Sequence, residues 1–398
     1  MMNNNRPIKK KKITRSSSMW SAISLWMKVL FHNTILLVNI IFVILLLLSY
    51  LSAIVSPQDF WLLSFFGLAY PFFLFANIFF AFYWALKRRL LLLWSLIAIL
   101  VGFNHLGNTF QLRFSQKQPA NPKNSFTFLS YNVRLFNLYR WIDDETVTQQ
   151  IYNFLLGEDP DVMCIQEYFY STDDPFNHSR DYRRLHNRYS HIAYSSSNNA
   201  DFNFGIATFS RYPIVNKGVI QFTNSSNISI YTDIAINNDT IRVFNNHLQS
   251  VQFTQDNFNF LDSLGKHDRR SNIEGLMDIG ARLKTAFVRR SRQVEIIAGH
   301  IAESPHPVIV TGDFNDTPVS YTYRILRRQG LEDAFVRSGS GIGNTYVAKI
   351  PLFRIDYILH SRDLESFYFD SPRIELSDHY PLKCEFSFRS DMSVPQQE

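Results

Sequence analysis

The chain has 398 residues, of which 46% are hydrophobic and 15% aromatic, enough for two or three domains with a large core. Its formal net charge of +6 is unevenly divided. Residues 1–125 contain 13 Lys and Arg and one acid, whereas residues 126–398 contain 27 Lys and Arg and 33 acids. The basic character therefore belongs to the N-terminal region, and the whole-chain charge does not indicate a nucleic-acid-binding domain.

Three long uncharged stretches follow one another in the N-terminal region. They cover residues 34–55, 60–86 and 90–110, and the first reads TILLVNIIFVILLLLSYLSAIV. Because about 20 apolar residues cross a bilayer, the sequence predicts about three transmembrane helices within residues 34–112. Polar residues in the second half of the third stretch leave two spans as an alternative. A cleaved signal peptide is disfavoured, because the first stretch is too long and begins too far from the N-terminus.

Basic residues predict the orientation of these spans. They cluster before the first stretch and again at Lys87–Arg89, whereas the loop Ser56–Asp59 has none. Lys and Arg next to spans remain in the cytoplasm, so residues 1–33 are expected to form a basic cytoplasmic tail. Three spans would place everything after residue 112 outside the cytoplasm, and two would place it inside. We expect a multi-pass protein of the cytoplasmic (inner) membrane with the region after residue 112 on the extracytoplasmic side.

A soluble domain follows the membrane region. Residues 113–125 are polar, include two prolines and are expected to form a linker, residues 126–388 the domain, and residues 389–398 a tail. Short apolar runs typical of buried strands dominate the domain, with helical patterns between them, which predicts an α+β fold of two packed sheets flanked by helices. Cys164 and Cys384 lie inside such runs, so packing is expected and pairing is left open.

The most informative motif is Gly312-Asp313-Phe314-Asn315, one residue beyond the apolar run Pro307–Val310. Side chains two residues apart in an extended chain point to the same side, so Asp313 and Asn315 are aimed at one place. A carboxylate can hold a water molecule, and an amide can bind an oxyanion. Hydrolysis of a phosphate ester requires both groups. Taken alone, Asp and Asn after a strand are also ordinary turn residues.

Polar side chains follow other apolar runs in the same way. Asn132 follows one run, Glu167 a second and His247 a third. Each has an ordinary explanation by itself, as a turn residue, a solvated acid or a structural histidine. A carboxylate at Glu167 would also be the hard oxygen ligand that Mg²⁺ or Mn²⁺ prefers.

One further acid is placed inside an apolar run. Asp356 would be costly to bury without a partner, and His379 is a suitable one. The same motif supplies a second carboxylate, Asp378. The sequence contains no nucleophile elbow, no glycine-rich phosphate loop and no zinc-type spacing of Cys or His. Metal-assisted attack by water is the chemistry that remains.

Seven motifs in order resemble the endonuclease/exonuclease/phosphatase superfamily, which has the deoxyribonuclease I-like fold. They are SYNVRLFN, CIQE, GIATFSRYPI, NNHLQS, VTGDFND, RIDYILHS and SDHYPL. The resemblance implies a four-layer α/β/β/α sandwich of two mainly antiparallel sheets, with a Mg²⁺-dependent site at one end, Mn²⁺ being possible. It implies that Glu167 is the main metal ligand, with Asn132 and Asp378 near the ion.

The resemblance also implies roles for the remaining residues. Asp313 would orient or deprotonate the attacking water, and Asn315 and His247 would stabilise charge on the phosphate. His379, held by Asp356, would contact the phosphate. The expected activity is hydrolysis of a phosphate ester, most simply a phosphodiester, by in-line attack of activated water.

The substrate class stays open. Arg134 stands where abasic-site endonucleases carry an acid, and Tyr168-Phe169 replaces their motif after Glu167, which argues against that branch. Nucleic acid or nucleotides are one class, and the head groups of phospholipids in the bilayer are the other, favoured by the membrane tether. A catalytically silent module that binds phosphorylated ligands at the membrane is the alternative function. The sequence indicates no protein partner.

Overall fold

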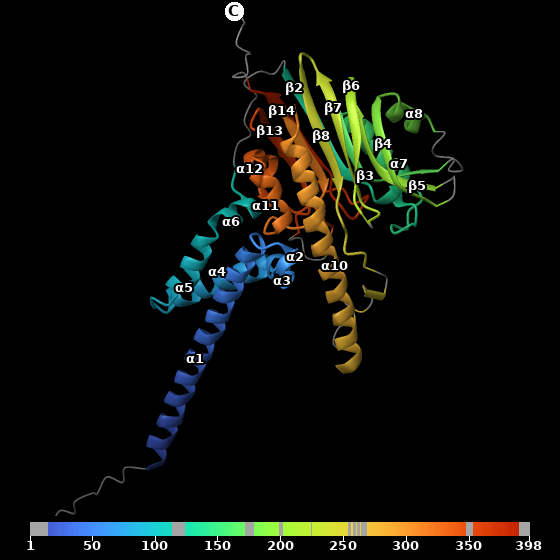
Figure 1. Cartoon of the computed structure of the whole chain (residues 1–398). Coiled ribbons are helices and arrows are strands. Elements are labelled where there is room, and N and C mark those ends of the chain that lie inside the picture. Colours follow the sequence, from blue (N-terminus) through green and yellow to red (C-terminus); the bar gives the residue numbers. More distant parts are fainter. Residues whose placement is uncertain are drawn as a thin grey trace, which may run out of the picture. The chain divides into compact units, whose positions relative to one another are not determined.

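The computed structural model describes most of the chain (Figure 1). The described residues are 15–113, 124–171, 179–198, 202–223, 225–253, 256–257, 260, 263, 269–347 and 353–389. Nearly all of the expected linker and C-terminal tail lies outside them. The chain divides into two compact units. One contains Met1–Leu47 and Phe72–Val101, and the other contains Leu48–Pro71 and Gly102–Glu398.

Helix α1 covers Arg15–Ser52. Among the described helices it alone is long and apolar enough by itself to cross a membrane, through its part Ile23–Ser52. This part begins earlier than the predicted first span, and α1 itself begins inside the expected tail. The apolar residues before position 34 continue the helix without a breaker. An N-terminal apolar helix of this kind is compatible with a membrane anchor.

The second and third predicted spans are broken helices. α3, Leu62–Leu68, meets α4, Tyr70–Leu86, at 60°, and α5, Leu92–Val101, meets α6, Phe103–Thr109, at 68°. Each pair is apolar enough to be a span only if its two helices are counted together. The prediction of about three transmembrane helices is therefore not confirmed, because a hydropathy pattern does not register a bend.

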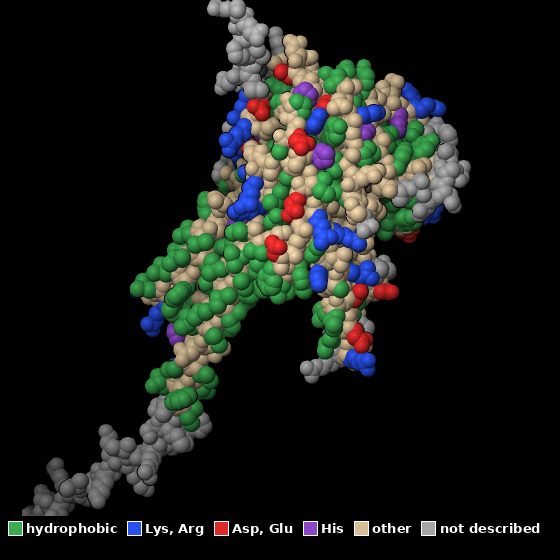
Figure 2. All heavy atoms as spheres, viewed as in Figure 1, with side chains coloured by type: hydrophobic (Ala, Val, Ile, Leu, Met, Phe, Trp, Pro, Cys, Tyr) green, Lys and Arg blue, Asp and Glu red, His purple; other side chains and the backbone are tan. Residues whose placement is uncertain are grey.

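Within the first unit, one buried asparagine joins three helices. The Asn39 side chain on α1 donates to Ser95 Oγ on α5 at 2.7 Å and accepts from Trp84 Nε1 on α4 at 2.9 Å. Such polar contacts between helices are typical of membrane segments. Large apolar side chains cover the outside of these helices (Figure 2).

Two six-stranded sheets form the centre of the second unit. The first sheet has the strand order β10-β12-β9-β8-β7-β6. Its strands are β6 Ile214–Gln221, β7 Ile228–Ile236, β8 Asp239–His247, β9 Val308–Asp313, β10 Glu332–Asp333 and β12 Asp356–His360. The second sheet has the strand order β13-β14-β2-β3-β5-β4. Its strands are β2 Ser125–Asn132, β3 Val162–Ser171, β4 Tyr189–Asn198, β5 Phe202–Ser210, β13 Leu364–Asp370 and β14 Leu382–Phe388. Each is antiparallel apart from one parallel pair, β8–β9 or β2–β3.

Helices cover the outer faces of both sheets (Figure 1). They are α7 Val147–Glu158, α8 Arg180–His186, α10 Arg269–Ala302 and α11 Tyr321–Arg328. The short helix α12, Ala334–Ser338, instead contacts β12 and β13 at the edge of the sandwich, and its Ala334 belongs to the core between the sheets. Alternate residues of a strand face opposite sides, so each central strand contributes to two apolar cores. Phe128 packs between the sheets, whereas Leu129 packs with Ile151 of α7. Phe244 packs with Val294 of α10, which completes the predicted four layers.

Both cysteines belong to the core between the sheets. Cys164 of β3 and Cys384 of β14 are buried and free. They pack as small apolar side chains, as the sequence pattern predicted.

The two parallel pairs position the polar side chains. In β2–β3, Asn132 is opposite Gln166, and in β8–β9, His247 is opposite Asp313. Parallel neighbours end at the same edge of a sheet. Strand β12 runs antiparallel to β9, and its first residue, Asp356, is opposite Asp313. Residues from far apart in the sequence therefore meet at one end of the sandwich.

A buried ion pair stabilises the loops at this end. Arg354 Nη1 lies 2.8 Å from Asp333 Oδ2, and the two side chains are only 4% and 0% exposed. Asp333 also accepts hydrogen bonds from Tyr323 Oη at 2.8 Å and from Phe335 N at 3.0 Å. The pair thus connects α11, α12 and the loop before β12.

We expect Asp333→Ala to lower the free energy of unfolding by about 3–5 kcal/mol, because it leaves the Arg354 guanidinium buried without its counter-charge. Urea unfolding of the detergent-solubilised chain, followed by near-ultraviolet circular dichroism, measures the change. Glu274→Ala is the control, since it breaks an exposed pair with Arg270 and should shift the midpoint far less. Equal shifts for the two variants would contradict the prediction.

Candidate active site

Glu167 reaches the site because β3 is irregular at this position. The pairing of β3 with β5 shifts register between Ile165 and Tyr168, and Glu167 has a φ of 50°. A bulge of this kind turns one side chain out of the regular alternation. A positive φ is unfavourable for a side-chain-bearing residue and is typical of functional positions. The Glu167 carboxylate accepts a hydrogen bond from Asn132 Nδ2 at 3.2 Å.

Asn132 connects the two sheets. Its Nδ2 also donates to Asp313 Oδ2 at 3.1 Å, so one amide bridges the ends of β3 and β9. Its Oδ1 accepts from the backbone N of Arg134 at 3.0 Å, which fixes the orientation of the amide. The amide thereby holds the carboxylates of Glu167 and Asp313 close to each other.

Asp313 is the most strongly hydrogen-bonded acid of the site. Besides Asn132, it accepts from Asn315 N at 2.8 Å and from Asn315 Nδ2 at 3.1 Å. The preceding Gly312 has a φ of 118°, and a Cβ there would lie 2.0 Å from Asn246 O. Only glycine fits so close to the neighbouring strand β8, which explains the glycine of this motif.

Asn315 is hydrogen-bonded to the residues around it. Its Nδ2 donates to Leu248 O at 3.0 Å as well as to Asp313, so both amide hydrogens are engaged within the protein. This arrangement orients the Asp313 carboxylate. It presents no free Asn315 donor to a phosphate.

His247 contributes an unpartnered nitrogen. Its Nε2 lies 3.7 Å from Glu167 Oε1 and 3.9 Å from Asp313 Oδ2. This atom is buried and has no hydrogen-bond partner among the residues that the structure describes. Burial lowers the pKa of His247, while the Asp313 charge opposes that shift. His247 is therefore a neutral imidazole facing the two acids.

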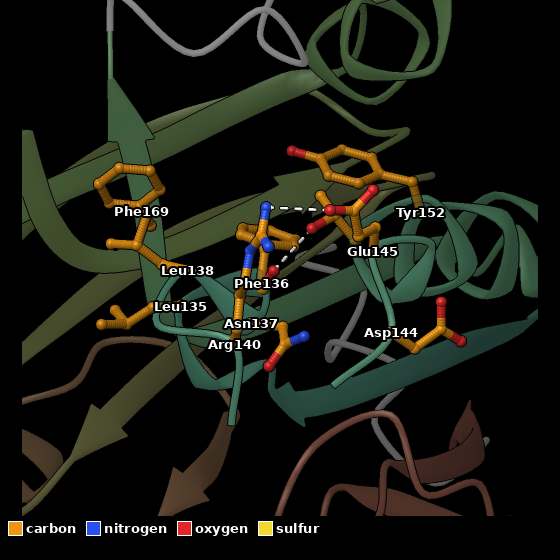
Figure 3. Close-up of a pocket in the computed structure, with 10 residues that line it drawn as sticks. Leu135, Phe136, Asn137, Leu138, Arg140, Asp144, Glu145, Tyr152 and Phe169 are labelled. Atoms are coloured by element: carbon orange, nitrogen blue, oxygen red, sulfur yellow. Dashed lines mark hydrogen bonds and ion pairs between the residues drawn. The ribbon is translucent and has the colours of Figure 1, made fainter. Parts of the chain in front are cut away.

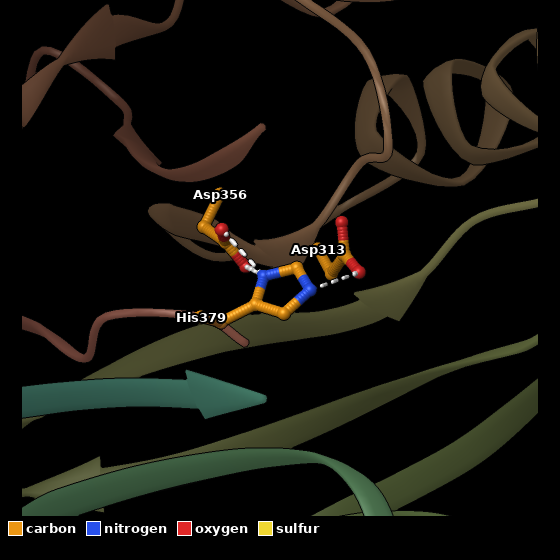
Figure 4. A group of neighbouring side chains, drawn as sticks. All are labelled: Asp313, Asp356 and His379. Carbon is orange, nitrogen blue, oxygen red and sulfur yellow. Dashed lines mark hydrogen bonds and ion pairs between the residues drawn. The ribbon is translucent and has the colours of Figure 1, made fainter. Parts of the chain in front are cut away.

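His379 lies between two aspartates (Figure 4). Its Nδ1 is 2.9 Å and 3.0 Å from the carboxylate oxygens of Asp356, and its Nε2 is 3.6 Å from Asp313 Oδ2. Burial acts to lower the pKa of His379, but Asp356 and Asp313 outweigh it and hold the pKa well above its ordinary value. His379 is thus a charged imidazolium that donates to Asp356.

Carboxylates accumulate around these residues. Burial, reinforced by Asp356, raises the pKa of Asp313 to about 6, although the His379 charge opposes this shift. Loss of water around the Glu167 carboxyl, with the Asp378 charge, raises the pKa of Glu167. Asp378 itself lies 4.0 Å from His379 Nε2. A group of acids with raised pKa values is typical of a functional site.

The structure brings all of the predicted site residues together. Contacts of 4.0 Å or less connect them in one network, which contains Asn132, Glu167, His247, Asp313, Asn315, Asp356, Asp378 and His379. The residues come from both sheets and from the loop before β14.

The donor set fits a divalent cation. Asp313, Asp356 and His379 offer ligand atoms within 4.8 Å of one another. His379, however, is protonated between its aspartates, which leaves its nitrogens unsuited to a metal. The oxygens of Glu167 and the neighbouring Asp378 are the type of ligand that Mg²⁺ takes. The excess of carboxylates over cationic side chains at this edge also favours a cation here.

Arg134 is a site residue to which the sequence assigned no role. Its Nε lies 3.4 Å from Asp378 Oδ2, and its guanidinium stacks 4.5 Å from the Trp141 ring. Arg134 and the next three residues, up to Asn137, all have a positive φ. Asn137 stabilises this left-handed turn through two hydrogen bonds to the backbone of Ile142, at 2.8 and 3.0 Å. Asparagine tolerates that conformation, but no sequence signal indicated a run of this length.

Asn245 was also missed. It is fully buried beneath the site, where its Oδ1 accepts from Gln166 Nε2 at 2.7 Å and its Nδ2 donates to Ala207 O at 2.9 Å. These bonds join the first sheet to the second. The signal was the pair of asparagines before His247, since buried amides require partners.

Two pockets lie near this edge. One is lined by Glu167, His247, Ser195, Asn227 and Gln252, among others, and so adjoins the site at two of its residues. The other lies between the left-handed turn and α7 (Figure 3). It contains the ion pair between Arg140 and Glu145, at 3.2 Å, and none of the predicted site residues lines it.

Comparisons with known proteins find a curated relative of this chain. Over 101 residues the chain is 32% identical to the uncharacterized protein YbhP of Escherichia coli K12, which covers 24% of this chain and 40% of that relative. The chain thus spans less than half of the relative's length.

Solved structures are also similar to this chain. An endonuclease/exonuclease/phosphatase from Bacteroides vulgatus has 16% identity and a TM-score of 0.49, covering 67% of this chain and 99% of that one. The human Nocturnin catalytic domain has 18% identity and a TM-score of 0.48, covering 70% of this chain and 97% of that one.

Family models match both parts of the chain. Residues 32–109 match a model described only as a domain of unknown function. Residues 129–379, more than half of the chain, match the model of the endonuclease/exonuclease/phosphatase family. The chain belongs to the endonuclease/exonuclease/phosphatase family.

Proposed function

We propose that the chain is a membrane-anchored, divalent-metal-dependent phosphoesterase that hydrolyses a phosphodiester by in-line attack of water. The observation that supports this most directly is the network joining Glu167, Asn132 and Asp313 at the ends of two parallel strand pairs. An oriented base next to a cation-binding acid is the arrangement that metal-assisted hydrolysis needs. Family membership supports the reaction class.

Glu167 would hold the metal ion, with Asn132 and Asp378 beside it. When bound, Mg²⁺ or Mn²⁺ would neutralise charge on the phosphate and on the leaving oxygen, worth several kcal/mol of the barrier. Asn132 already contacts Glu167, so its amide would keep this carboxylate oriented toward the substrate.

Asp313 would accept the proton of the attacking water. With a pKa raised to about 6 by burial, it is ionised at neutral pH yet basic enough to take a proton. Asn132 and Asn315 hold its carboxylate through three hydrogen bonds. A positioned base of this kind contributes roughly 10²–10⁴-fold to the rate.

The two histidines would bind the phosphate oxygens. His379 is charged because Asp356 and Asp313 outweigh the effect of burial on its pKa, so its Nε2–H is a charge-assisted donor. His247 offers the unpartnered Nε2 beside Glu167 and Asp313. Loss of one such donor typically costs about 2.7–4 kcal/mol of transition-state stabilisation.

For the membrane region we propose three spans in the cytoplasmic membrane, each bent helix pair counting as one. The catalytic domain would then be extracytoplasmic, because both basic clusters remain inside. The apolar surface of the helices in the first unit supports the proposal (Figure 2).

We expect Glu167→Gln and Asp313→Asn each to lower kcat on a soluble phosphodiester by at least about 100-fold, since each removes a charge from the reacting centre. Turnover of bis(p-nitrophenyl) phosphate by the detergent-solubilised chain with Mg²⁺ is the assay. Asp239→Asn, an exposed acid at the start of β8, is the control and should be unchanged. A wild type that binds Mn²⁺ and phosphorylated ligands but hydrolyses no ester would instead support a silent binding module.

We expect the affinity for Mn²⁺ to fall at acidic pH. Asp313 lies beside the residues that would hold the ion and has a pKa raised to about 6, so below that pH its negative charge is lost and the cation is attracted less strongly. Protonation of this one group weakens apparent binding by at most about tenfold for each further pH unit. Electron paramagnetic resonance titrations between pH 5 and 7 measure this slope, and Asp313→Asn should flatten it. Affinity independent of pH down to 5 would argue against a cation beside Asp313.

The topology is tested by fusing alkaline phosphatase after residue 115. Three spans would export the reporter, so we expect high phosphatase activity in whole cells. A fusion after Lys87, between the second and third stretches, should be inactive because that loop is cytoplasmic. An inactive reporter at residue 115 would leave two spans and a cytoplasmic catalytic domain.

A further inference from the structure

The segment that follows helix α1 is attached to the catalytic loop after β9. Ser52 Oγ at the end of α1 donates to Val319 O at 2.9 Å, six residues beyond Asp313. Gly67 of α3 packs so closely here that a Cβ would lie 2.5 Å from Val319 O. The point at which the apolar helix ends is therefore fixed to the edge of the sandwich that carries the site.

The same segment packs along α10. Gln58 of α2, Pro57–Phe60, donates to Glu295 at 3.0 and 3.1 Å. Phe65 of α3 meets Phe287 edge-on, with 5.3 Å between ring centroids. This part of α10 is also next to the site, because Gln293 accepts from Gln249 N at 2.8 Å. Gln249 follows His247 by two residues.

The chain segment that leaves the last apolar helix attaches to the same edge. Asn108 O accepts a hydrogen bond from Arg354 Nη2 at 2.7 Å. Arg354 lies two residues before Asp356. Strand β1, Phe110–Gln111, pairs with β11, Gly341–Ile342. From β11 the chain continues to Tyr346, whose ring lies edge-on to His379 at 5.5 Å.

Both segments that flank the apolar helices are thus built into loops of the active site. From this arrangement we propose that the mouth of the site faces the bilayer surface, and that its substrate is the phosphate ester of a membrane lipid. This inference rests on the proposed phosphoesterase function and names its substrate class. A lipid phosphate lies in the plane next to residues 52–61, whereas a long polyanion would have to enter between the domain and the bilayer.

Helix α10 supplies a surface for that lipid. Phe287 of α10 contacts Phe65, and 18 residues of the helix precede it (Figure 1). At 1.5 Å per residue, they extend about 27 Å beyond this contact. Ile273, Leu276 and Met277 on this part are 48%, 50% and 69% exposed. Their spacing places them on one face of the helix.

The charge of this arm matches an anionic surface. The charged side chains of residues 269–292 are mostly basic, namely Arg269, Arg270, Arg282, Lys284, Arg289, Arg290 and Arg292, against Glu274 and Asp278. Arg270 and Arg282 pair with these two acids and Arg290 is buried, whereas Lys284 and Arg292 are exposed. Lys284 lies 4.9 Å over the ring of Trp61, in the segment after α1, so the arm is continuous with the membrane-flanking residues. An exposed apolar face bordered by Lys and Arg is typical of helices that lie in a lipid interface. The face is therefore assigned to lipid.

The test uses the full chain reconstituted into phosphatidylcholine vesicles that contain phosphatidylglycerol or phosphatidic acid. The triple variant Ile273→Ser, Leu276→Ser, Met277→Ser should lower release of the lipid's phosphate or head group about tenfold. Its turnover of soluble bis(p-nitrophenyl) phosphate should stay within about twofold of wild type, because the variant leaves the site intact. The matched control is Val215→Ser, Val219→Ser on β6, where the side chains are 59% and 45% exposed, and both activities should be unchanged.

A second measurement does not depend on activity. Met277→Cys carrying an environment-sensitive fluorophore should be quenched by spin-labelled lipid, whereas the same label at Val219→Cys should not. The native cysteines are buried and do not interfere. Hydrolysis of the soluble ester without lipid hydrolysis, or cleavage of DNA in preference to lipid, would overturn the inference and leave the phosphoesterase intact. A label unquenched at both positions would overturn the lipid-contacting role of α10, and absence of all hydrolysis would overturn both proposals.

Discussion

The site depends on one constraint, the alignment of two parallel strand pairs in two stacked sheets. Each pair delivers polar side chains to the same end, and Asn132 crosses between the sheets to contact both Glu167 and Asp313. Beneath it, Asn245 crosses in the other direction to Gln166 and Ala207. A slip of one residue in either sheet would turn these side chains to the opposite face. Two buried amides therefore fix the separation of the acids.

The price of this arrangement is a concentration of negative charge in a poorly solvated place. Asp313 and Glu167 have raised pKa values because burial disfavours their ionised forms. His379 offsets part of the charge, as it remains protonated between Asp356 and Asp313. A bound cation would offset more, and the same negative field that weakens the empty site would strengthen its hold on a metal ion, which in turn would attract a phosphate.

The sequence predicted the candidate site residues because each follows a local apolar run, and it predicted the layers because ordered motifs resemble a family with that fold. An apolar run followed by a polar residue locates a strand end, and ordered motifs locate the fold. The bend at the start of α4 was missed, because hydropathy measures composition and not direction. The hydrogen bond from Asn315 to the carbonyl of Leu248 could not be predicted, since it depends on how the loop after β8 packs against this residue. The left-handed turn after Asn132 was missed, because no sequence pattern indicates four successive positive φ values, even though the bonds from Asn137 to Ile142 that stabilise them are local.

The two free cysteines have a practical meaning for the catalytic domain. Both thiols are sealed in the core between the sheets, and burial raises the pKa of Cys164 to about 12 and that of Cys384 well above its ordinary value. Thiolate, the reactive form, is therefore scarce at either position. The fold needs no oxidase or disulfide isomerase to mature, and it can be produced in a reducing host as readily as in an oxidising compartment.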